Sequence, residues 1–591
     1  MGLIVQKFGG TSVADPEKIQ AAARKAIRAQ QQGHQVVVVV SAMGHQTDEL
    51  IRLAHQVNPR PPAREMDMLL STGEQVSVAL MAMAVQAMGY RAISLTGAQV
   101  GIRTDSIYSK ARIRSISTDR VQQLLQQGQI VIAAGFQGID ENFNITTLGR
   151  GGSDTTAVAL AAVLGADQCE IYTDVDGVYT TDPRLLPEAR LMDYVSYDEM
   201  LELASLGAGV MHSRAVEFGK KFDVPIHVRS SFSDIPGTLI TTEPESRTRP
   251  VTGAAWVRNE ARVTLRGVPD RPGVSLALFA PIAQRNITVD MIVQNVGADG
   301  RADISFTVPH ADLGAALEAV EQTARQLGAQ GVDSNNQVAK ISVVGLAMAR
   351  QTGVARRMFQ ALAQAGVNIL MITTSEIKIS VLVPEDQGLA ALRAVHQAFL
   401  LHEKPEDAPP PHQGKVQRRS SSNAVAVVEH LRGMEDLLVE SVELDDTQSR
   451  VTLAGVPDRP GVAARVFDYL GRQGVFVDMI VQSFGRRGLA SLSFTVHQQD
   501  LPVALRAAEE VAGQFQARVT HAEQMAKLSV TGVGMRSHAG VAIRMFEALA
   551  REKINIDMTS TSEVRINVVV GREDGSRGLE ALRKTFAESM A

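Results

Sequence analysis

The chain has 591 residues, too many for a single hydrophobic core, so about three to five domains are expected. Its composition is globular, with 45% hydrophobic and 21% charged residues, and a formal net charge of −5 without a long Lys/Arg block argues against binding to nucleic acid or to an anionic membrane. The single cysteine, Cys169, excludes an internal disulfide and fits a reducing compartment. Since no basic-then-apolar leader opens the sequence and no apolar run reaches about 18 residues, we predict a soluble cytoplasmic protein.

Up to about residue 242, apolar strand-like runs alternate with helical patterns, which is typical of a mostly parallel sheet covered by helices. The sequence therefore predicts a first α/β domain over residues 1–245. Its expected strands are 3–8, 36–40, 92–95, 130–134, 169–173 and 225–228, and its expected helices include 16–30, 66–88 and 153–164.

The first expected strand ends in a glycine turn. Gly9 and Gly10 have no Cβ, so backbone N–H groups can approach phosphate oxygens there, and Lys7 adds a positive charge. Asp15 and Pro16 then indicate the cap and first position of a helix. An ordinary strand-to-helix turn fits the same residues, so this segment alone does not establish a phosphate site.

A second glycine-rich turn, residues 147–156, runs directly into an apolar helix. A helix N-terminus offers unpaired N–H groups and partial positive charge, with Ser153 as the expected cap, and Arg150 can grip a carboxylate or phosphate through two parallel hydrogen bonds. The structural alternative is a well-capped helix with a surface arginine.

A third segment, residues 171–184, places hydroxyls, carboxylates and an arginine on turns after a strand, where open parallel sheets bind their ligands. A hairpin turning at Asp176–Gly177 is an alternative reading that does not exclude the first. No Walker motif, no G-x-G-x-x-G after a strand and no metal-binding His/Cys spacing is present. We interpret the isolated His212 and His227 as structural.

After residue 250 the chain repeats itself. The motif V-P-D-R-P-G at 268–273 recurs at 456–461, and V-D-M-I-V-Q at 289–294 recurs at 477–482. Each copy is also doubled internally, because Gly353 and the helix after it follow their strand much as Gly273 and its helix follow theirs. The sequence therefore predicts four small α/β modules in two tandem pairs. The predicted bounds are 260–335, 336–401, 440–522 and 523–591, with a Pro- and Ser-rich linker at 402–422 between the pairs.

The motifs at 7–12, 71–74, 149–154 and 173–184, in this order, resemble the aspartate kinases of the amino-acid kinase superfamily. The repeated modules resemble ACT domains, ferredoxin-like βαββαβ units that bind amino acids. The resemblance implies an amino-acid kinase fold followed by four ACT modules, and transfer of the ATP γ-phosphoryl group to the β-carboxylate of L-aspartate, giving 4-phospho-L-aspartate on the route to lysine, threonine, methionine and isoleucine. Because no dehydrogenase domain follows the modules, a monofunctional kinase is expected.

The substrate carboxylate is already ionised at pH 7, so the reaction needs alignment and relief of charge repulsion instead of a general base. The resemblance implies that ATP binds together with Mg²⁺ and that its phosphates lie at Lys7, Phe8, Gly9 and Gly10. It implies no side chain of the protein as a metal ligand. The resemblance surrounds the nucleotide with Thr173, Asp174, Tyr179, Thr180, Thr181, Asp182, Pro183 and Arg184.

The resemblance also assigns the aspartate site. Ser41 and Thr47 would face the substrate carboxylate, Glu74 would bind the α-ammonium group, and Arg150 with Gly151, Gly152 and Ser153 would bind the α-carboxylate. Asp154 would orient Lys7 and the metal environment, which makes Lys7, Glu74, Arg150 and Asp154 the expected catalytic set. Phe232 is a departure, because some family members carry a lysine near the nucleotide there.

For regulation, the resemblance implies lysine and threonine as effectors and a homodimer formed through the ACT modules. The expected effector residues are Asp270, Gly273, Val274, Ile292, Val293, Gln294, Asn295, Asn368, Ile369, Asp458, Gly461, Ile480, Val481 and Gln482. Ser483 replaces Asn295 in the later repeat, so equal affinities are not expected. Three alternatives stay open: modules that only dimerise, a kinase of another amino acid or carbamate, and an amino-acid sensor with an inactive kinase domain.

Overall fold

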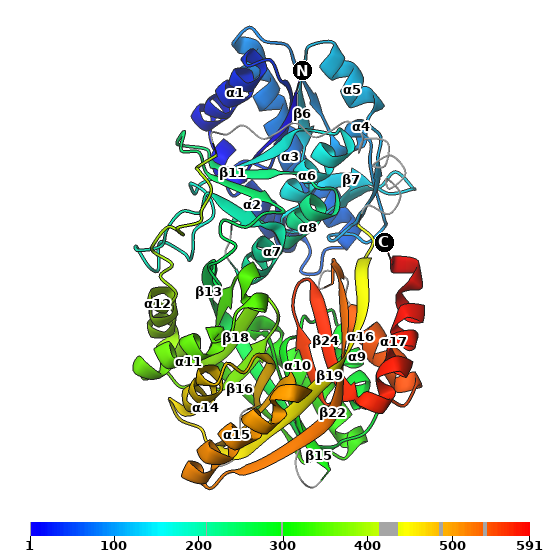
Figure 1. Cartoon of the computed structure of the whole chain (residues 1–591). Coiled ribbons are helices and arrows are strands. Elements are labelled where there is room, and N and C mark those ends of the chain that lie inside the picture. Colours follow the sequence, from blue (N-terminus) through cyan, green and yellow to red (C-terminus); the bar gives the residue numbers. More distant parts are fainter. Residues whose placement is uncertain are drawn as a thin grey trace. The chain divides into compact units, whose positions relative to one another are not determined.

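The computed structural model describes residues 2–207, 210–296, 300–412, 435–483, 488–535 and 540–590 (Figure 1). The chain forms two compact units. The first consists of Met1–Tyr179, Leu191–Glu245 and Ala408–Asp436, and the second of Thr180–Arg190, Ser246–Asp407 and Leu437–Ala591. Of the predicted linker 402–422, residues 413–422 lie outside the described part of the chain.

The first unit is built on an eight-stranded sheet in the order β10-β12-β11-β9-β1-β2-β6-β3, whose neighbouring strands are parallel except for β11 with β12. The strands are β1 (Leu3–Phe8), β2 (Gln35–Val40), β3 (Ala92–Leu95), β6 (Ile130–Ala134), β9 (Gln168–Thr173), β10 (Tyr194–Ser196), β11 (Ile226–Ser230) and β12 (Thr238–Thr241). The expected mostly parallel sheet is thus confirmed, because each of the six predicted strands falls on one of these elements.

Among the residues that the structure describes, this unit also contains a smaller four-stranded sheet and the helices α1 to α8. The small sheet, in the order β5-β4-β7-β8, contains β4 (Ile102–Thr104), β5 (Ile113–Ile116), β7 (Gln137–Ile139) and β8 (Ile145–Thr147). The helices are α1 (Pro16–Gln31), α2 (Gln46–Val57), α3 (Ala63–Ala87), α4 (Gly97–Val100), α5 (Asp119–Gln126), α6 (Gly152–Val163), α7 (Tyr197–Ser205) and α8 (Ser213–Lys221).

Two predicted helix starts have different outcomes. Asp15 caps α1 as expected, since its side chain accepts a hydrogen bond from the Lys18 N–H (2.9 Å). Ser153 does not cap α6. Gly151 takes the left-handed conformation (φ 75°) and is the N-cap, so the helix begins at Gly152 and Ser153 lies buried within its first turn.

Helix α3 is the one helix, among the described residues, that is long and apolar enough to cross a membrane by length and composition alone. Val78, Met81 and Val85 of this helix are buried in a hydrophobic cluster of the first unit. Asp67 and Glu74, on the same helix, are also buried and accept hydrogen bonds from backbone N–H groups. These features are those of a core helix of a globular unit.

The second unit contains a twelve-stranded antiparallel sheet in the order β14-β15-β13-β16-β18-β17-β20-β21-β19-β22-β24-β23, and β14 and β23 at its two ends are also in contact. The strands are β13 (Gly253–Pro269), β14 (Asp290–Val296), β15 (Arg301–Pro309), β16 (Gly331–Val344), β17 (Met371–Thr374), β18 (Lys378–Pro384), β19 (Leu438–Pro457), β20 (Val477–Ser483), β21 (Leu489–His497), β22 (Arg518–Val533), β23 (Met558–Thr561) and β24 (Arg565–Gly571). Its helices are α9 (Val274–Gln284), α10 (Leu313–Leu327), α11 (Val354–Gln364), α12 (Gly388–Ala398), α14 (Val462–Arg472), α15 (Leu501–Phe515), α16 (Val541–Arg551) and α17 (Arg572–Phe586).

Strand pairing shows that the modules of each pair are threaded through one another. Residues 253–257 of β13 pair with 340–344 of β16, which belong to the second module, whereas 262–266 of β13 pair with 331–335 in the first. In the later pair, residues 438–445 of β19 pair with 527–533 of β22 in the same way. The predicted module bounds therefore differ from the strand pairing in two places. Residues 253–257, which lie before the first predicted module, complete the second module. Residues 440–445, which were predicted in the third module, belong to the fourth.

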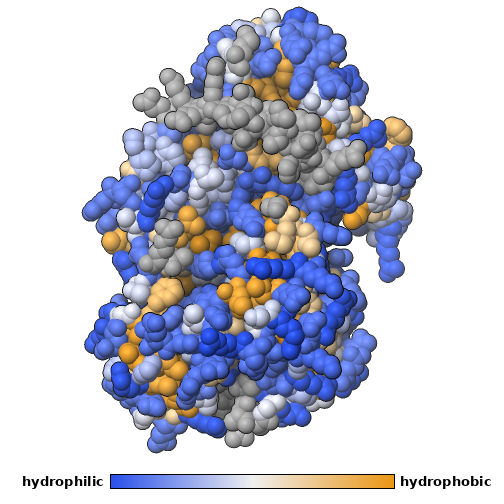
Figure 2. Space-filling view, turned by 45° about the vertical axis from the view of Figure 1, so that its right-hand side comes forward, coloured by the Kyte–Doolittle hydropathy of each residue, from blue (hydrophilic) through white to orange (hydrophobic). Residues whose placement is uncertain are grey.

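The helix-covered cores join modules of different pairs. One hydrophobic cluster combines the first and fourth modules, for example through Phe279 and Phe546, whose ring centroids are 6.0 Å apart. Another combines the second and third modules, where Phe359 and Phe467 are 5.3 Å apart. On the face shown in Figure 2, hydrophilic residues predominate and hydrophobic residues gather in limited patches.

Candidate active site and effector pockets

Four neighbouring parallel strands of the first unit end side by side. The Gly9 N–H donates to the Tyr172 carbonyl at the end of β9 (3.3 Å), and the Ser41 N–H donates to the Phe8 carbonyl at the end of β1 (3.1 Å). The Gly135 N–H donates to the carbonyl of Val40 at the end of β2 (3.1 Å). The turns after β9, β1, β2 and β6 thus form one edge, where an open parallel sheet binds its ligands.

The first glycine turn is closely packed against the turn after β2. A Cβ on Gly10 would lie 2.9 Å from the Ala42 carbonyl oxygen and 3.1 Å from that of Gly44. The Gly44 N–H also donates to the Gly10 carbonyl (3.0 Å). This approach requires glycine at position 10, because backbone atoms cannot move aside as a flexible side chain can.

Lys7 joins the two predicted glycine motifs. Its Nζ lies 2.6 Å from the Asp154 Oδ1, and both side chains are 11% exposed. Asp154 lies in the first turn of α6, so the N-terminal end of that helix is held beside the end of β1. Lys7 and the α6 N-terminus therefore place positive charge at the same strand edge.

Arg150 lies in the turn that leads into α6 and is exposed. Within the described ranges, its side chain forms no hydrogen bond or ion pair with another residue. Its neighbour Gly151 packs so tightly on His212 that a Cβ there would lie 2.3 Å from the His212 Cβ. His212 itself accepts a hydrogen bond from the Arg214 N–H (3.4 Å), and its structural role stays a prediction.

Glu74 faces the same edge from helix α3. The Ala42 N–H donates to its Oε1 (3.1 Å), while Oε2 is buried without a hydrogen-bond partner within the described part of the chain. The residue is 3% exposed, and burial raises its pKa from 4.5 to about 7. A cation that reached Oε2 would satisfy this buried oxygen and favour the ionised form.

The other expected residues of the first unit lie on the same turns. Ser41 follows β2, Thr47 is in the first turn of α2, and both are partly buried. Thr173 ends β9 and donates from Oγ1 to Asp174 Oδ1 (3.2 Å). Tyr179 forms a bridge with Leu191.

The remaining expected nucleotide residues, 180–184, belong to the second compact unit. There the Arg184 guanidinium donates to both carboxylate oxygens of Asp182, and these hydrogen bonds lower the pKa of that carboxyl group. Their role at the nucleotide stays a prediction.

Phe232 is 57% exposed at the rim of a pocket of about 160 Å³ in the first unit. This pocket is also lined by Phe8, Ser12, Lys18 and Ser231, and Ser231 donates from Oγ to the Ser12 Oγ (2.6 Å).

His227 is fully buried, its Nε2 lies 2.5 Å from the Pro236 carbonyl oxygen, and burial lowers its pKa to about 4. The structural reading of His227 is consistent with these contacts.

The second unit contains two equivalent polar pockets. At one, Gln294 donates to the Ile556 carbonyl (2.9 Å) and Asn555 donates to Asp270 Oδ1 (3.0 Å). At the other, Gln482 donates to the Ile369 carbonyl (2.7 Å) and Asn368 donates to Asp458 Oδ1 (2.9 Å). The first pocket is lined by Gly273, Gln294, Asn555 and Ile556 among others, and the second by Ile369, Asp458, Gly461 and Gln482.

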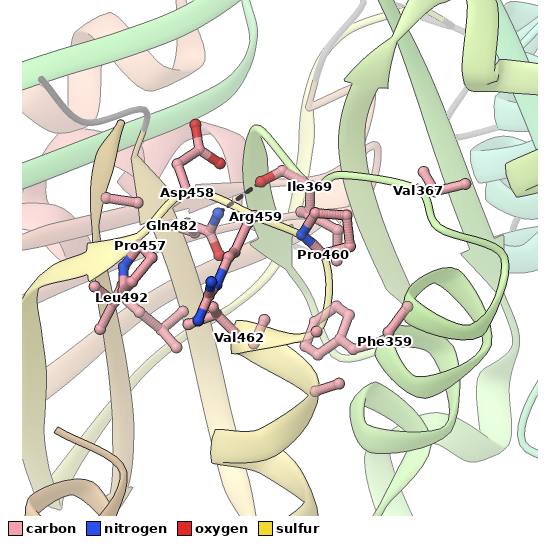
Figure 3. A pocket seen from close by; sticks show the side chains of 16 residues that line it. Phe359, Val367, Ile369, Pro457, Asp458, Arg459, Pro460, Val462, Gln482 and Leu492 are labelled. Atoms are coloured by element: carbon pink, nitrogen blue, oxygen red, sulfur yellow. Dashed lines mark hydrogen bonds between the residues drawn. The ribbon is translucent and has the colours of Figure 1, made fainter. Parts of the chain in front are cut away.

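Each pocket therefore joins an aspartate turn from one module pair to an Asn-Ile segment from the other. Figure 3 shows the second pocket, with Asp458 and Arg459 on the turn before α14 and Phe359 on α11. Sequence reasoning missed Asn555 and Ile556. The repeat contained the signal, since I-N-I at 554–556 corresponds to V-N-I at 367–369.

Some expected effector residues are placed elsewhere. The side chains of Val293 and Val481 join a methionine-rich cluster separate from the helix-covered cores that contain Ile292 and Ile480. Val293 and Val481 adjoin Gln294 and Gln482 in the sequence, but successive strand residues face opposite sides of a sheet. Val274 lines the first pocket. The side chain of Asn295 lies outside the described part of the structure.

Comparison with known proteins identifies the two parts of the chain. The model of the amino acid kinase family matches residues 2–230. Models of the ACT domain match residues 263–325, 341–399, 451–511 and 528–586. Fold and site therefore define an ATP-dependent amino-acid kinase with ACT domains.

The aspartokinase of Pseudomonas aeruginosa is 53% identical over 404 residues, which cover 68% of this chain and 98% of that protein. Aspartokinase 2 of Bacillus subtilis is 51% identical over 406 residues, covering 68% of this chain and 99% of that protein. The chain belongs to the aspartokinase family and is an aspartate kinase.

Solved structures of aspartate kinases resemble the structure of this chain. The enzyme from Synechocystis is 42% identical, with 99% of this chain and 98% of that chain covered and a TM-score of 0.53. E. coli aspartokinase III in complex with lysine and aspartate is 25% identical, with 67% of this chain and 99% of that chain covered and a TM-score of 0.53. The amino-acid kinase fold followed by ACT modules is thereby confirmed.

Proposed function

We propose that the chain transfers the γ-phosphoryl group of ATP to the β-carboxylate of L-aspartate at the strand edge that carries Lys7, Glu74 and Arg150. A carboxylate oxygen forms a bond to the γ-phosphorus while the bond from that phosphorus to the bridging oxygen breaks, and ADP leaves with the electron pair. The ionised carboxylate needs no proton acceptor. The observation that carries the proposal is the Lys7–Asp154 ion pair, which unites both glycine turns.

The amino-acid substrate bridges two groups of opposite charge. Its α-ammonium group binds the unpaired Glu74 Oε2, and its α-carboxylate binds Arg150 and the N–H groups of residues 151–153 at the start of α6. Ser41 and Thr47 then direct the β-carboxylate toward the phosphate. A substrate held at both ends approaches the phosphorus in a defined orientation, which lowers the entropic part of the barrier.

The nucleotide phosphates lie over Lys7, Phe8, Gly9 and Gly10. Gly10 packs so closely on the carbonyls of Ala42 and Gly44 that a side chain at this position would not fit. Lys7 stabilises the charge that develops on the transferred group, and Asp154 holds Lys7 in place. Mg²⁺ enters with ATP, because phosphate oxygens are its preferred ligands, and it neutralises phosphate charge when bound. In the first unit, residues 173–174 and 179 would hold the rest of the nucleotide.

Feedback control by lysine and threonine is proposed for the two equivalent pockets. In each, an aspartate and an asparagine side chain supply acceptors and donors for an α-amino acid, and the N-terminus of α9 or α14 favours its carboxylate. The pockets differ at Ser275, which corresponds to Ala463, so they can prefer different side chains. The lysine complex of E. coli aspartokinase III supports an amino-acid effector.

We also propose that the chain forms a homodimer through its ACT modules and that it is located in the cytoplasm.

A hydroxamate assay with ATP, Mg²⁺ and candidate acceptors tests the reaction. We expect hydroxamate to form with L-aspartate and not with L-glutamate. Product only with another amino acid or with carbamate would identify a different kinase of this fold. No product with any acceptor, from protein that binds lysine or threonine, would identify a sensor.

The two pockets are expected to act separately. Asp458→Ala should raise the inhibitory concentration of one effector by about 10-fold or more, because it removes a charge-assisted hydrogen bond at one pocket only. Asp270→Ala should act likewise on the other effector. Inhibition curves for lysine, threonine and both together measure this, and equal weakening of both effectors by either change would contradict separate pockets.

A further inference from the structure

The turn that carries Arg150 is held from outside by the N-terminal part of helix α8. The Arg214 Nη1 donates to the carbonyl oxygen of Leu148, directly before this turn (2.5 Å). On the other side of the turn, His212 packs against Gly151. The position of Arg150 therefore depends on α8 as well as on β8 and α6.

Arg214 is in turn held by a carboxylate from a distant part of the sequence. Its Nη2 lies 2.6 Å from Glu435 Oε2, and its Nε donates to the same oxygen at 3.1 Å. The Ile113 N–H donates to Glu435 Oε1 (2.8 Å), and Arg214 Nη2 also donates to the Ala111 carbonyl (3.1 Å). The side chains of Arg214 and Glu435 are 15% and 8% exposed, so removing one partner would leave the other charge poorly solvated.

Glu435 lies where the chain passes between the compact units. The first unit ends at Asp436, whose carbonyl accepts a hydrogen bond from Lys221 Nζ (3.0 Å). The second unit resumes at Leu437, and β19 begins at Leu438. β19 contains the outer strand of the fourth module and the first strand of the third, so Glu435 is three residues from the strand shared by this module pair.

We propose that Glu435 and Arg214 are positioning residues for the kinase reaction, through which the later pair of ACT modules acts on the substrate-binding turn. The inference rests on the proposed role of Arg150. When β19 moves, it pulls on Glu435. Loss of the Glu435 carboxylate from Arg214 leaves the guanidinium to reorient toward water, and its hydrogen bond to the Leu148 carbonyl weakens. Arg150 then loses its position without any change in the groups that touch substrate.

Kinetics of Glu435→Gln and Arg214→Lys test this coupling. Glu435→Gln keeps the side-chain shape but not the charge, and Arg214→Lys keeps the charge but cannot reach all its acceptors. Each should raise the KM for aspartate by about 10-fold, since a small misplacement of a positioning group is costly. The KM for ATP should change less than about 2-fold in the same variants. Inhibition by lysine and threonine should become incomplete at saturation, while calorimetric binding of the effectors stays unchanged.

Asp436→Asn is the matched control, because its exposed side chain contacts Arg114 and not Arg214. It should retain the wild-type KM values and complete inhibition. If Glu435→Gln and Arg214→Lys lower only the melting temperature, with the KM for aspartate and the inhibition unchanged, the pair is merely structural and the coupling is wrong. If Arg150→Ala leaves the KM for aspartate unchanged, the proposed role of Arg150 in substrate binding is wrong. This outcome is distinguishable from failure of the coupling, because the coupling is tested with the Glu435 and Arg214 variants.

Discussion

Replacing Lys7 with alanine is expected to reduce kcat by about 1,000-fold, since in the proposed mechanism the side chain stabilises the charge on the transferred phosphoryl group. Arg150→Ala should differ in kind, raising mainly the KM for aspartate, because the proposed role of Arg150 is to bind the α-carboxylate, which does not react. Steady-state kinetics with ATP and aspartate varied separately distinguish these effects.

Lys220→Ala is the matched control for Lys7→Ala. Lys220 is 18% exposed at its side chain and forms an ion pair with Asp198 (3.0 Å), but it lies at the end of α8 away from the strand edge. Its loss should leave kcat within about 2-fold of wild type, as usual for an ion pair away from the reacting groups. Wild-type turnover in Lys7→Ala, with thermal unfolding like that of the control, would remove Lys7 from the mechanism.

Glu74→Gln is expected to raise the KM for aspartate by about 100-fold while making the protein more stable at alkaline pH. In the folded chain, burial raises the pKa of Glu74 to about 7, whereas an unfolded glutamate titrates near 4.5. Between these values the unfolded state is ionised and the folded state keeps its proton, so wild-type stability falls as pH rises through this window and stays lower above pH 7. The neutral glutamine removes this loss of folding stability, which amounts to at most about 3 kcal/mol in the free energy of unfolding.

Denaturant unfolding from pH 5 to pH 8 measures this effect, and the difference between Glu74→Gln and wild type should grow with pH. Glu199→Gln is the control, since Glu199 is fully buried at the start of α7 and accepts hydrogen bonds from Ser196. For the wild-type enzyme, kcat/KM for aspartate should rise with an apparent pKa near 7 as Glu74 ionises. A flat profile between pH 6 and pH 8 would exclude Glu74 as the ligand of the ammonium group.

Much of the fold could be predicted because its signals are local. The alternation of apolar runs and helices located the strands of the parallel sheet, and Asp15 with Pro16 located the start of α1. The two glycine turns were found because strand ends of a parallel sheet meet at one edge, which brings Lys7 and Asp154 together. The four modules could also be predicted from local signals, since each copy of the repeat keeps its own strands and turns.

The start of α6 shows a limit of local reasoning. A serine is a favoured cap, but Gly151 is pressed against His212, takes the left-handed conformation and begins the helix one residue earlier. The pKa of Glu74 also depends on the tertiary structure, because burial of the side chain raises it, while the hydrogen bond from the Ala42 N–H, in the turn after β2, acts in the opposite direction. Neither neighbour is close in sequence.

The amino-acid sequence by itself determined which segments become strands, helices and glycine turns, and which motifs are repeated. Only the tertiary structure decided which repeats meet: Asp270 faces Asn555 and Asp458 faces Asn368, and residues 253–257 complete a module that begins some eighty residues later. The physical reason is that local conformation follows from neighbouring residues, whereas pairing between distant strands follows from burying all apolar faces of the sheet at once.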